Sequence, residues 1–443
     1  MKNHQLSIRR YPSYTDSGYG WDQKIPNSWK EARVKNIFKL VTDLAPDDNN
    51  FELLSLYTSI GVRPRKDMEQ RGNKSVTTDG YWIVKKGDII VNKLLAWMGA
   101  IGLSEYDGVT SPAYDILRKL SDGIDQRFYT YLFRTEKAQS IFKKHSRGIM
   151  DVRLRLYFDK FGAISVPFPP LSEQKSIAQY LDTKTAQIDR KIDLLTQKAT
   201  QYGNLKQSLI NETVTRGRDR SVPMKDSAIE WIGEVPEHWE IYRIKDHTYV
   251  KGRIGWQGLR SSDFLDEGEF YCVTGTDLVN GSIDWSYCYF VSQDRYDQDK
   301  YIQLKTQDLL ITKDGTIGKI ALLNELPLKA TLNSGLFVTR PLKTKYKNEF
   351  MYWVLNSSSF RNYIDLTKGG STVQHLYQNV FDRFLYACPP LSEQKAIATY
   401  LDTKTTQIDQ IIQTINTQIE KLKELRKTLI NDVVTGKIKV TED

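Results

Sequence analysis

The sequence lacks the motifs on which most catalytic and metal-binding sites depend. Its 443 residues include only three cysteines and five histidines. These form no CxxC pair, no HExxH motif and no zinc-ligand spacing. There is no GxxxxGK[ST] phosphate loop, and the glycine clusters at residues 99–102 and 315–318 are too short for a dinucleotide fingerprint. No common catalytic or metal site is therefore predicted.

The sequence also has no long apolar run. The first residues lead into no apolar stretch, and no segment is long and apolar enough to span a bilayer. Apolar residues make up 40% of the chain and charged residues 26%, which is typical of a globular protein. We expect a cytoplasmic protein of two or three domains, in which Cys272, Cys288 and Cys388 are reduced thiols.

What the sequence does contain is an internal repeat. Residues 169–175, PPLSEQK, return 220 positions later as residues 389–395. The match continues without a gap through YLDTKT at residues 180–185 and 400–405. A repeat of this length is large enough for a domain followed by a helix, so it is not the period of a solenoid. The chain therefore carries one scaffold twice.

A second match, at an offset of 210, lies near the beginning of each copy. It pairs Trp21 with Trp231 and Trp29 with Trp239. These tryptophans are expected in the core, because they belong to the shared frame. The middle of each copy contains short β-rich runs but differs from its counterpart in most side chains. The expected parts are a first domain at residues 1–168, a first helix at 169–217, a second domain at 218–388 and a second helix at 389–443.

Each shared segment has the pattern of one long helix with a single apolar stripe. The apolar positions step by three or four, except for one step of seven in which Thr185 or Thr405 fills the gap. Gly217 and Gly436 mark the helix ends. The stripes consist of Ile177, Leu181, Ile188, Ile192, Leu195, Ala199, Tyr202, Leu205 and Leu209, and of Ile397, Leu401, Ile408, Ile412, Ile415, Ile419, Leu422, Leu425 and Leu429.

This spacing favours a coiled coil between the two helices, with docking of each helix on its own domain as the alternative. A two-fold axis perpendicular to the helices would make the pair antiparallel. The predicted fold class is therefore α+β, with two mixed α/β domains separated by two long helices that pack as an antiparallel coiled coil with pseudo-two-fold symmetry. A helix of about 44 residues spans roughly 65 Å, which corresponds to at most ~19 base pairs of B-DNA. The helix pair is expected to set the distance between the two domains.

The positive charge of the chain suggests a polyanionic partner. The net charge is +9 and the pI is near 9.0. In both domains basic residues are mixed with aromatic residues and glycines, although for any single residue a solvated surface charge is the alternative. Candidate DNA-contacting residues of the first domain are Arg63, Arg65, Lys66, Arg71, Lys74, Arg147, Arg153 and Arg155. Those of the second domain are Lys251, Arg253, Trp256, Gln257, Arg260, Lys313, Thr316, Lys319, Ser371, Thr372, Gln374 and His375.

Four residues off the stripes are repeated in both helices and are predicted to face outward. They are Tyr180 and Lys184 in the first helix and Tyr400 and Lys404 in the second. A spacer alone would not need two identical outer faces. These residues are therefore candidates for docking two identical partners.

The repeated segments resemble the conserved regions of type I restriction-modification specificity subunits. The resemblance rests on PPLSEQKxIAxYLDTKTxQID in both copies, on NLKQSLIN at residues 204–211 and on WIGEVPEHW at residues 231–239. It implies a target recognition domain for each half of a bipartite, asymmetric DNA site. It also implies docking of two methyltransferase subunits and, through them, motor-nuclease subunits. S-adenosylmethionine, ATP and Mg²⁺ would be bound by those partners, with no cofactor on this chain.

Two other functions stay open at this point. One is a stand-alone, two-headed DNA-binding regulator without a methyltransferase partner. The other is a coiled-coil scaffold whose basic surface binds no DNA. Co-purification with a methyltransferase would distinguish the first from a specificity subunit, and salt-dependent affinity for duplex DNA would exclude the second.

Overall fold

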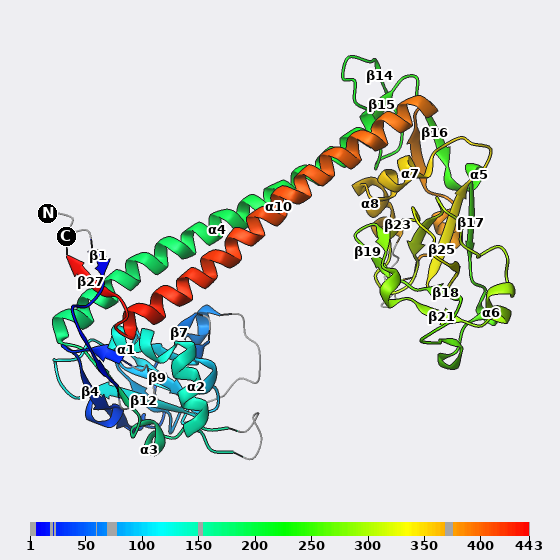
Figure 1. The fold of residues 1–443 in the computed structure, drawn as a ribbon. Coiled ribbons are helices and arrows are strands. Elements are labelled where there is room, and N and C mark those ends of the chain that lie inside the picture. The colour runs from blue at the N-terminus through cyan, green and yellow to red at the C-terminus, as the bar shows by residue number, and fades with distance from the viewer. Residues whose placement is uncertain are drawn as a thin grey trace. The chain divides into compact units, whose positions relative to one another are not determined.

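The computed structural model describes residues 6–17, 21, 24–58, 60–68, 78–148, 154–367 and 375–442. The chain forms two compact units, one of residues 1–195 with 417–443 and the other of residues 196–416. The elements of both are labelled in Figure 1. Two long helices, α4 (Leu171–Arg216) and α10 (Leu391–Val434), each contribute one half to each unit. Within the described ranges, no helix combines the length and the apolarity that a membrane span requires.

The first unit is built on a four-stranded antiparallel sheet in the order β10-β9-β12-β5. Its strands are β5 (Phe38–Val41), β9 (Ile89–Asn92), β10 (Ile101–Leu103) and β12 (Tyr114–Lys119), and the helices that follow them are α1 (Gln126–Phe133), α2 (Glu136–His145) and α3 (Phe158–Phe161). The other strands of this unit are β1 (Leu6–Arg9), β2 (Tyr14–Asp16), β3 (Lys24–Pro26), β4 (Lys30–Arg33), β6 (Leu54–Tyr57), β7 (Gly61–Pro64), β8 (Trp82–Val84), β11 (Gly108–Thr110), β13 (Ser165–Phe168) and β27 (Lys439–Glu442).

The second unit repeats this sheet in the order β17-β25-β22-β23. The strands are β17 (Thr248–Gly252), β22 (Leu309–Thr312), β23 (Ile320–Leu322) and β25 (Leu336–Pro341). A second, three-stranded sheet of β18 (Phe270–Val273), β21 (Tyr289–Val291) and β24 (Lys329–Leu332) contains the parallel pair β18–β24. The remaining elements are β14 (Met224–Asp226), β15 (Glu234–Pro236), β16 (Glu240–Arg243), α5 (Ile244–His247), β19 (Leu278–Val279), β20 (Ser282–Ile283), α6 (Gln293–Asp297), α7 (Asn348–Leu355), α8 (Ser358–Thr367), α9 (Gln378–Phe381) and β26 (Leu385–Cys388).

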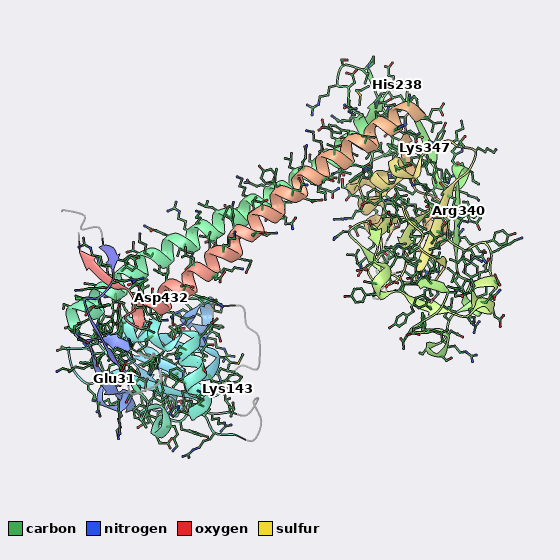
Figure 2. All side chains as sticks on the ribbon, viewed as in Figure 1. Glu31, Lys143, His238, Arg340, Lys347 and Asp432 are labelled. Atoms are coloured by element: carbon green, nitrogen blue, oxygen red, sulfur yellow. The ribbon has the colours of Figure 1, made fainter. Side chains whose placement is uncertain are left out.

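A buried ion pair occupies the same place in both four-stranded sheets. In the first unit Arg118 donates two hydrogen bonds to Asp88, at 2.9 and 2.7 Å. In the second unit Arg340, labelled in Figure 2, donates to both carboxylate oxygens of Asp308 at 2.6 Å. Both aspartates are buried, and bidentate geometry makes such pairs strong and directional. The two domains therefore share a frame down to individual side chains.

The tryptophans of the shared frame lie in the cores, as the sequence predicted. Trp21, Trp29 and Trp239 are buried, and Trp231 packs against the core of the second unit. In the first unit, aromatic rings of α1, α2 and α3 meet edge to face, for example Phe133 and Phe161 at 5.3 Å between centroids. This geometry is favourable for the ring quadrupoles. The repeated tryptophans are thus structural.

The repeated sequence PPLSEQK anchors each domain to its helix. Glu173 accepts a hydrogen bond from Trp29 at 3.0 Å, and Glu393 accepts one from Trp239 at 3.2 Å. The next residue, Gln174 or Gln394, is completely buried. Its amide accepts from a backbone N–H of the domain and donates to the carbonyl of the first proline. The motif is therefore a buried polar joint, which explains why both copies retain it.

The two long helices run antiparallel in each unit. In the first unit Ile177, near the start of α4, shares a core with Val433, at the end of α10. In the second unit Ile397, near the start of α10, shares a core with Val214, near the end of α4. A glycine in the left-handed conformation lies just beyond the end of each helix, as predicted: φ is +75° at Gly217 and +79° at Gly436.

The apolar stripes serve two kinds of packing. Their beginnings belong to the domain cores, as at Leu181 and Leu401, whereas Ile415 and Ile419 are buried farther along α10. The prediction was wrong at Leu205 and Leu425, which are both 53% exposed. The next residues, Lys206 and Arg426, are partly buried and turn toward the partner helix instead.

The first unit also brings the two ends of the chain together. Strand β1 pairs antiparallel with β27, with Ile8 opposite Val440. Val440 is buried in the core of that unit. The carboxyl-terminal segment therefore completes the first unit rather than trailing from it.

Candidate DNA-binding surface

The basic loop after β17 divides into buried and exposed residues. Arg253 is 2% exposed and Gln257 is 5% exposed, so neither is available to DNA, contrary to the sequence-based prediction. Arg253 donates to the carbonyl of Leu332 at 2.8 Å and to the hydroxyl of Thr331 at 3.2 Å. Its guanidinium therefore joins the loop to β24. Burial lowers the pKa of Arg253.

Three cationic side chains reach the surface in or near this loop. Arg260 is exposed and its backbone N–H donates to Asp263 at 2.7 Å. The ammonium groups of Lys251 and Lys300 lie 5.9 and 5.4 Å from the ring centroid of Tyr301, which is itself exposed. Trp256 belongs to a short 3-10 turn at Gly255–Gln257. Lys251, Lys300 and Tyr301 thus combine cations with an aromatic ring, a combination suited to contact with nucleic acid.

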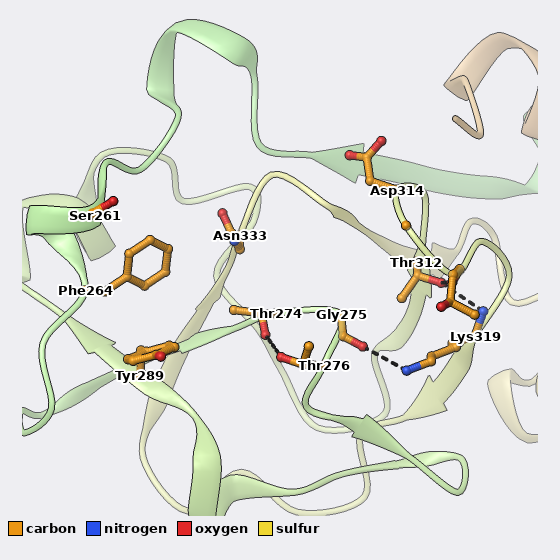
Figure 3. Close-up of a pocket in the computed structure, with 12 residues that line it drawn as sticks. Ser261, Phe264, Thr274, Gly275, Thr276, Tyr289, Thr312, Asp314, Lys319 and Asn333 are labelled. Atoms are coloured by element: carbon orange, nitrogen blue, oxygen red, sulfur yellow. Dashed lines mark hydrogen bonds between the residues drawn. The ribbon is translucent and has the colours of Figure 1, made fainter. Parts of the chain in front are cut away.

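A cleft of about 730 Å³ lies beside the turn between β22 and β23. Figure 3 shows its lining, which includes two of the predicted residues, Thr316 and Lys319. The opposite wall carries Phe264 and Tyr289, whose rings meet edge to face at 5.3 Å between centroids. Asn333, which composition and charge did not single out, also lines the cleft. The structure therefore brings together polar, cationic and aromatic groups from segments far apart in the sequence.

Other predicted residues of the second domain lie near this cleft or outside the described residues. His375 contacts Asp314 through its Nδ1, and the two residues also form an isolated β-bridge. The ammonium of Lys313 lies 5.1 Å from the ring centroid of Phe337. Ser371, Thr372 and Gln374 lie outside the described residues.

In the first domain the structure places some of the predicted residues in pairs. Arg147 and Arg155 face each other across a backbone bridge with two 2.9 Å hydrogen bonds, and both are exposed. The guanidinium of Arg155 donates to the hydroxyl of Tyr157 at 3.4 Å. These cations form a small exposed cluster at one edge of the domain.

Three more predicted residues of the first domain lie in or just after β7. Lys66 is exposed and forms an ion pair with Glu52, which raises the pKa of the lysine. Arg63 and Arg65 are partly buried. Arg71, Lys74 and Arg153 lie outside the described residues.

The predicted docking residues of the helices have unequal exposure. Tyr180 is 5% exposed and belongs to the core of the first unit, so the prediction that it faces outward was wrong. Lys184 is partly exposed, with its ammonium 5.8 Å from the Tyr180 ring centroid. The Tyr400 ring has the Arg218 guanidinium 4.9 Å from its centroid. Lys404 is exposed and Tyr400 is partly exposed, so only Tyr180 is excluded from the outward face.

Within the portions of the chain that the structure describes, no group of three or more His, Cys, Asp or Glu is placed to hold a metal ion. The three cysteines are free and buried, and burial raises the pKa of Cys272 and of Cys388 to about 12.

The sequence model described as "Type I restriction modification DNA specificity domain" matches the chain twice, at residues 26–201 and 236–421. Curated relatives include the MjaVIII type I restriction enzyme specificity subunit of Methanocaldococcus jannaschii, 24% identical over 94% of each chain. The putative MjaX specificity subunit of the same organism is 26% identical over 73% of this chain and 71% of its own.

Solved structures share the fold. A chain from a study of complex assembly and conformational transition of the type I R-M system aligns with a TM-score of 0.73 and 16% identity, over 94% of this chain and 100% of that one. The HsdS subunit from Thermoanaerobacter tengcongensis aligns with a TM-score of 0.56 and 15% identity, over 95% and 99%. The mixed α/β domains and long helices predicted from the repeat are thus confirmed.

Proposed function

The chain belongs to the family of type I restriction-modification DNA specificity subunits, the non-catalytic components of those systems, and on that premise we propose that it reads a bipartite, asymmetric DNA site. Each domain would bind one half-site. The observation that carries this proposal is the repetition of one frame with two different surfaces. The pairs Asp88–Arg118 and Asp308–Arg340 are equivalent, whereas the exposed loops around them differ in most residues.

The long helices support the bipartite reading. Both α4 and α10 run without a break from one unit into the other. A continuous helix is stiff over this length and rises 1.5 Å per residue. The helix pair would therefore fix the number of base pairs between the two half-sites.

We also propose that two methyltransferase subunits dock on this chain and recruit motor-nuclease subunits. The repeat supports this part of the proposal, because a surface that occurs twice suits two copies of one partner. Lys184 and Lys404 are repeated and accessible. S-adenosylmethionine, ATP and Mg²⁺ would be bound by those partners, and the complex would act on DNA in the cytoplasm.

Co-expression with methyltransferase subunits tests the assembly. The expected result is a complex of one chain with two methyltransferase subunits. The DNA affinity of this complex should fall steeply between about 50 and 200 mM salt. Sequencing of modified adenines in the host DNA should then show two short motifs at a constant spacing. Tight DNA binding without any methyltransferase partner would favour the stand-alone regulator, and salt-insensitive, weak binding would favour the scaffold.

A further inference from the structure

The cleft beside the β22–β23 turn has the chemistry of a surface that reads base edges. Its lining includes several hydroxyl groups, each of which can donate and accept hydrogen bonds. Among them are those of Ser261, Thr274, Thr276 and Thr316. The amide of Asn333 offers both functions as well. A phosphate only accepts hydrogen bonds, so it would use the donors of these groups and leave their acceptors unpaired. Base edges in the major groove present a mixture of donors and acceptors, which matches this lining.

The charge of the cleft supports the same assignment. Lys319 is its cation and Asp314 its carboxylate, so the two formal charges offset each other. Asp314 is already engaged by His375. A cleft with this balance would not concentrate phosphates. It can nevertheless direct one ammonium group toward a carbonyl or ring nitrogen of a base.

Two side chains in the cleft, Asn333 and Lys319, have hydrogen-bond donors that could bind a ligand. The Asn333 Oδ1 accepts from the backbone N–H of Ser334 at 2.7 Å. In the described part of the chain, the structure assigns no acceptor to its Nδ2 group. The Lys319 ammonium donates to the carbonyl of Gly275 at 3.4 Å, a long bond that uses one of its three donors. Figure 3 shows both residues at the cleft, together with the Lys319–Gly275 bond.

The equivalent turn of the first domain has the same base but a different tip. In each domain a lysine directly follows the strand, Lys93 after β9 and Lys313 after β22, and its carbonyl accepts a backbone hydrogen bond. The donor is the N–H of Leu156 at 2.9 Å in the first domain and the N–H of Leu376 at 2.8 Å in the second. The tip in the second domain is polar and glycine-rich, at residues 314–318. The tip in the first domain instead exposes leucines and a methionine, at Leu94, Leu95 and Met98.

The two domains therefore differ at the tip of the same turn, as two domains that bind different base sequences would. A common base holds each tip at the same place on its frame, while the side chains at the tip are free to vary. Apolar side chains favour the methyl group of thymine, whereas asparagine and lysine favour adenine and guanine. The tips are therefore suited to different base pairs.

We propose that the cleft receives base edges of the second half-site in duplex DNA, and that Asn333 and Lys319 determine its specificity. The proposal rests on the DNA-reading function proposed above. Asn333 would read adenine through its amide, and Lys319 would donate to guanine. The turn at residues 93–100 would do the corresponding work for the first half-site, through apolar contacts.

Selection from a library of randomised duplexes tests the proposal, using the full chain with any methyltransferase subunits that co-purify. Lys319→Met keeps the aliphatic stem and removes the charge. Asn333→Asp keeps the size of the side chain and removes its donor. We expect Lys319→Met to relax one position of one half-site by about tenfold, and Asn333→Asp to change an adenine preference to cytosine. The other half-site and the spacing should stay as in the wild type.

The matched control is Lys305→Met, an exposed lysine of the same domain outside the cleft. It should leave every base preference unchanged. All three variants should unfold at the wild-type temperature, since none of the substituted side chains is buried in the core. If the wild type selects a bipartite site and both cleft variants select the same one, the cleft assignment is wrong and the proposed function stands. If the wild type selects no sequence at all, the proposed function itself fails.

Discussion

The ammonium nitrogen of Lys206 lies 2.7 Å from a carboxylate oxygen of Asp409, and the same pair recurs in the other unit, where Arg426 lies 2.9 Å from Asp189. Asp189 and Asp409 are equivalent in the repeat, as are Lys206 and Arg426. Each pair joins α4 to α10. The internal symmetry of the sequence therefore extends to the charges between the helices, and the two pairs define a single register for the antiparallel packing.

Reversing one of these charges should weaken the helix pair in one unit only. Lys206→Glu places two carboxylates at this contact, and we expect a loss of about 0.5–1 kcal/mol in the free energy of unfolding, because the pair is half exposed. Adding Asp409→Lys to this variant should restore most of the lost free energy of unfolding. Denaturant titration of the single and double variants gives the coupling energy. Lys198→Glu, an exposed position on α4, is the control. Equal losses in the single and double variants would contradict the pairing.

We expect different roles for Arg253 and Arg260, although they lie close together in the sequence. Arg253→Ala removes a buried donor to Leu332 and Thr331, so we expect the second unit to lose about 2–4 kcal/mol of stability. Arg260→Ala should leave stability unchanged and weaken DNA binding, because that residue is exposed. Unfolding curves and DNA titrations on both variants make the comparison. A stable Arg253→Ala variant with reduced DNA affinity would reverse the assignment.

Each buried glutamine of the repeated motif should stabilise its own domain. Gln394→Ala leaves the backbone N–H of Lys347 (Figure 2) and the carbonyl of Pro389 without their 2.8 Å partner, and we expect a loss of about 2–4 kcal/mol in the second unit. Gln174→Ala should do the same in the first unit. Hydrogen exchange measured by mass spectrometry resolves the two units. Gln410→Ala, an exposed glutamine on α10, should have no effect. Faster exchange spread evenly over both units would argue against separate joints.

The sequence predicted the large-scale organisation because that organisation is repeated. Two matched segments located the long helices, the frame tryptophans and the stripe residues, and Trp29 and Trp239 are indeed buried. Periodicity also identified most of the stripe. It failed at Leu205 and Leu425 because a lysine or arginine can bury its aliphatic stem and extend its charge to the partner helix. Periodicity counts apolar residues and does not register this alternative.

The site was less predictable, for a different reason. Charge pointed to Arg253, but whether a guanidinium faces solvent or the carbonyl of Leu332 depends on tertiary packing. Tyr180 was misplaced in the same way, since its neighbours in the core come from other segments. Asn333 carries no charge and belongs to no motif. The one signal that could have found it is the contrast between equivalent turns, and that comparison needs the strand register.

The three cysteines should be unreactive in the folded protein. Burial raises the pKa of Cys272 and Cys388 to about 12, and it also raises the pKa of Cys288. At pH 8 an ordinary thiol is partly ionised, whereas these stay protonated, so the thiolate needed for attack is almost absent. We expect a disulfide reagent to label no cysteine at pH 8 under native conditions and three after denaturation. A single exposed cysteine introduced as Ser121→Cys should react at once. Rapid native labelling of the wild type would show that the second unit opens more readily than its packing implies.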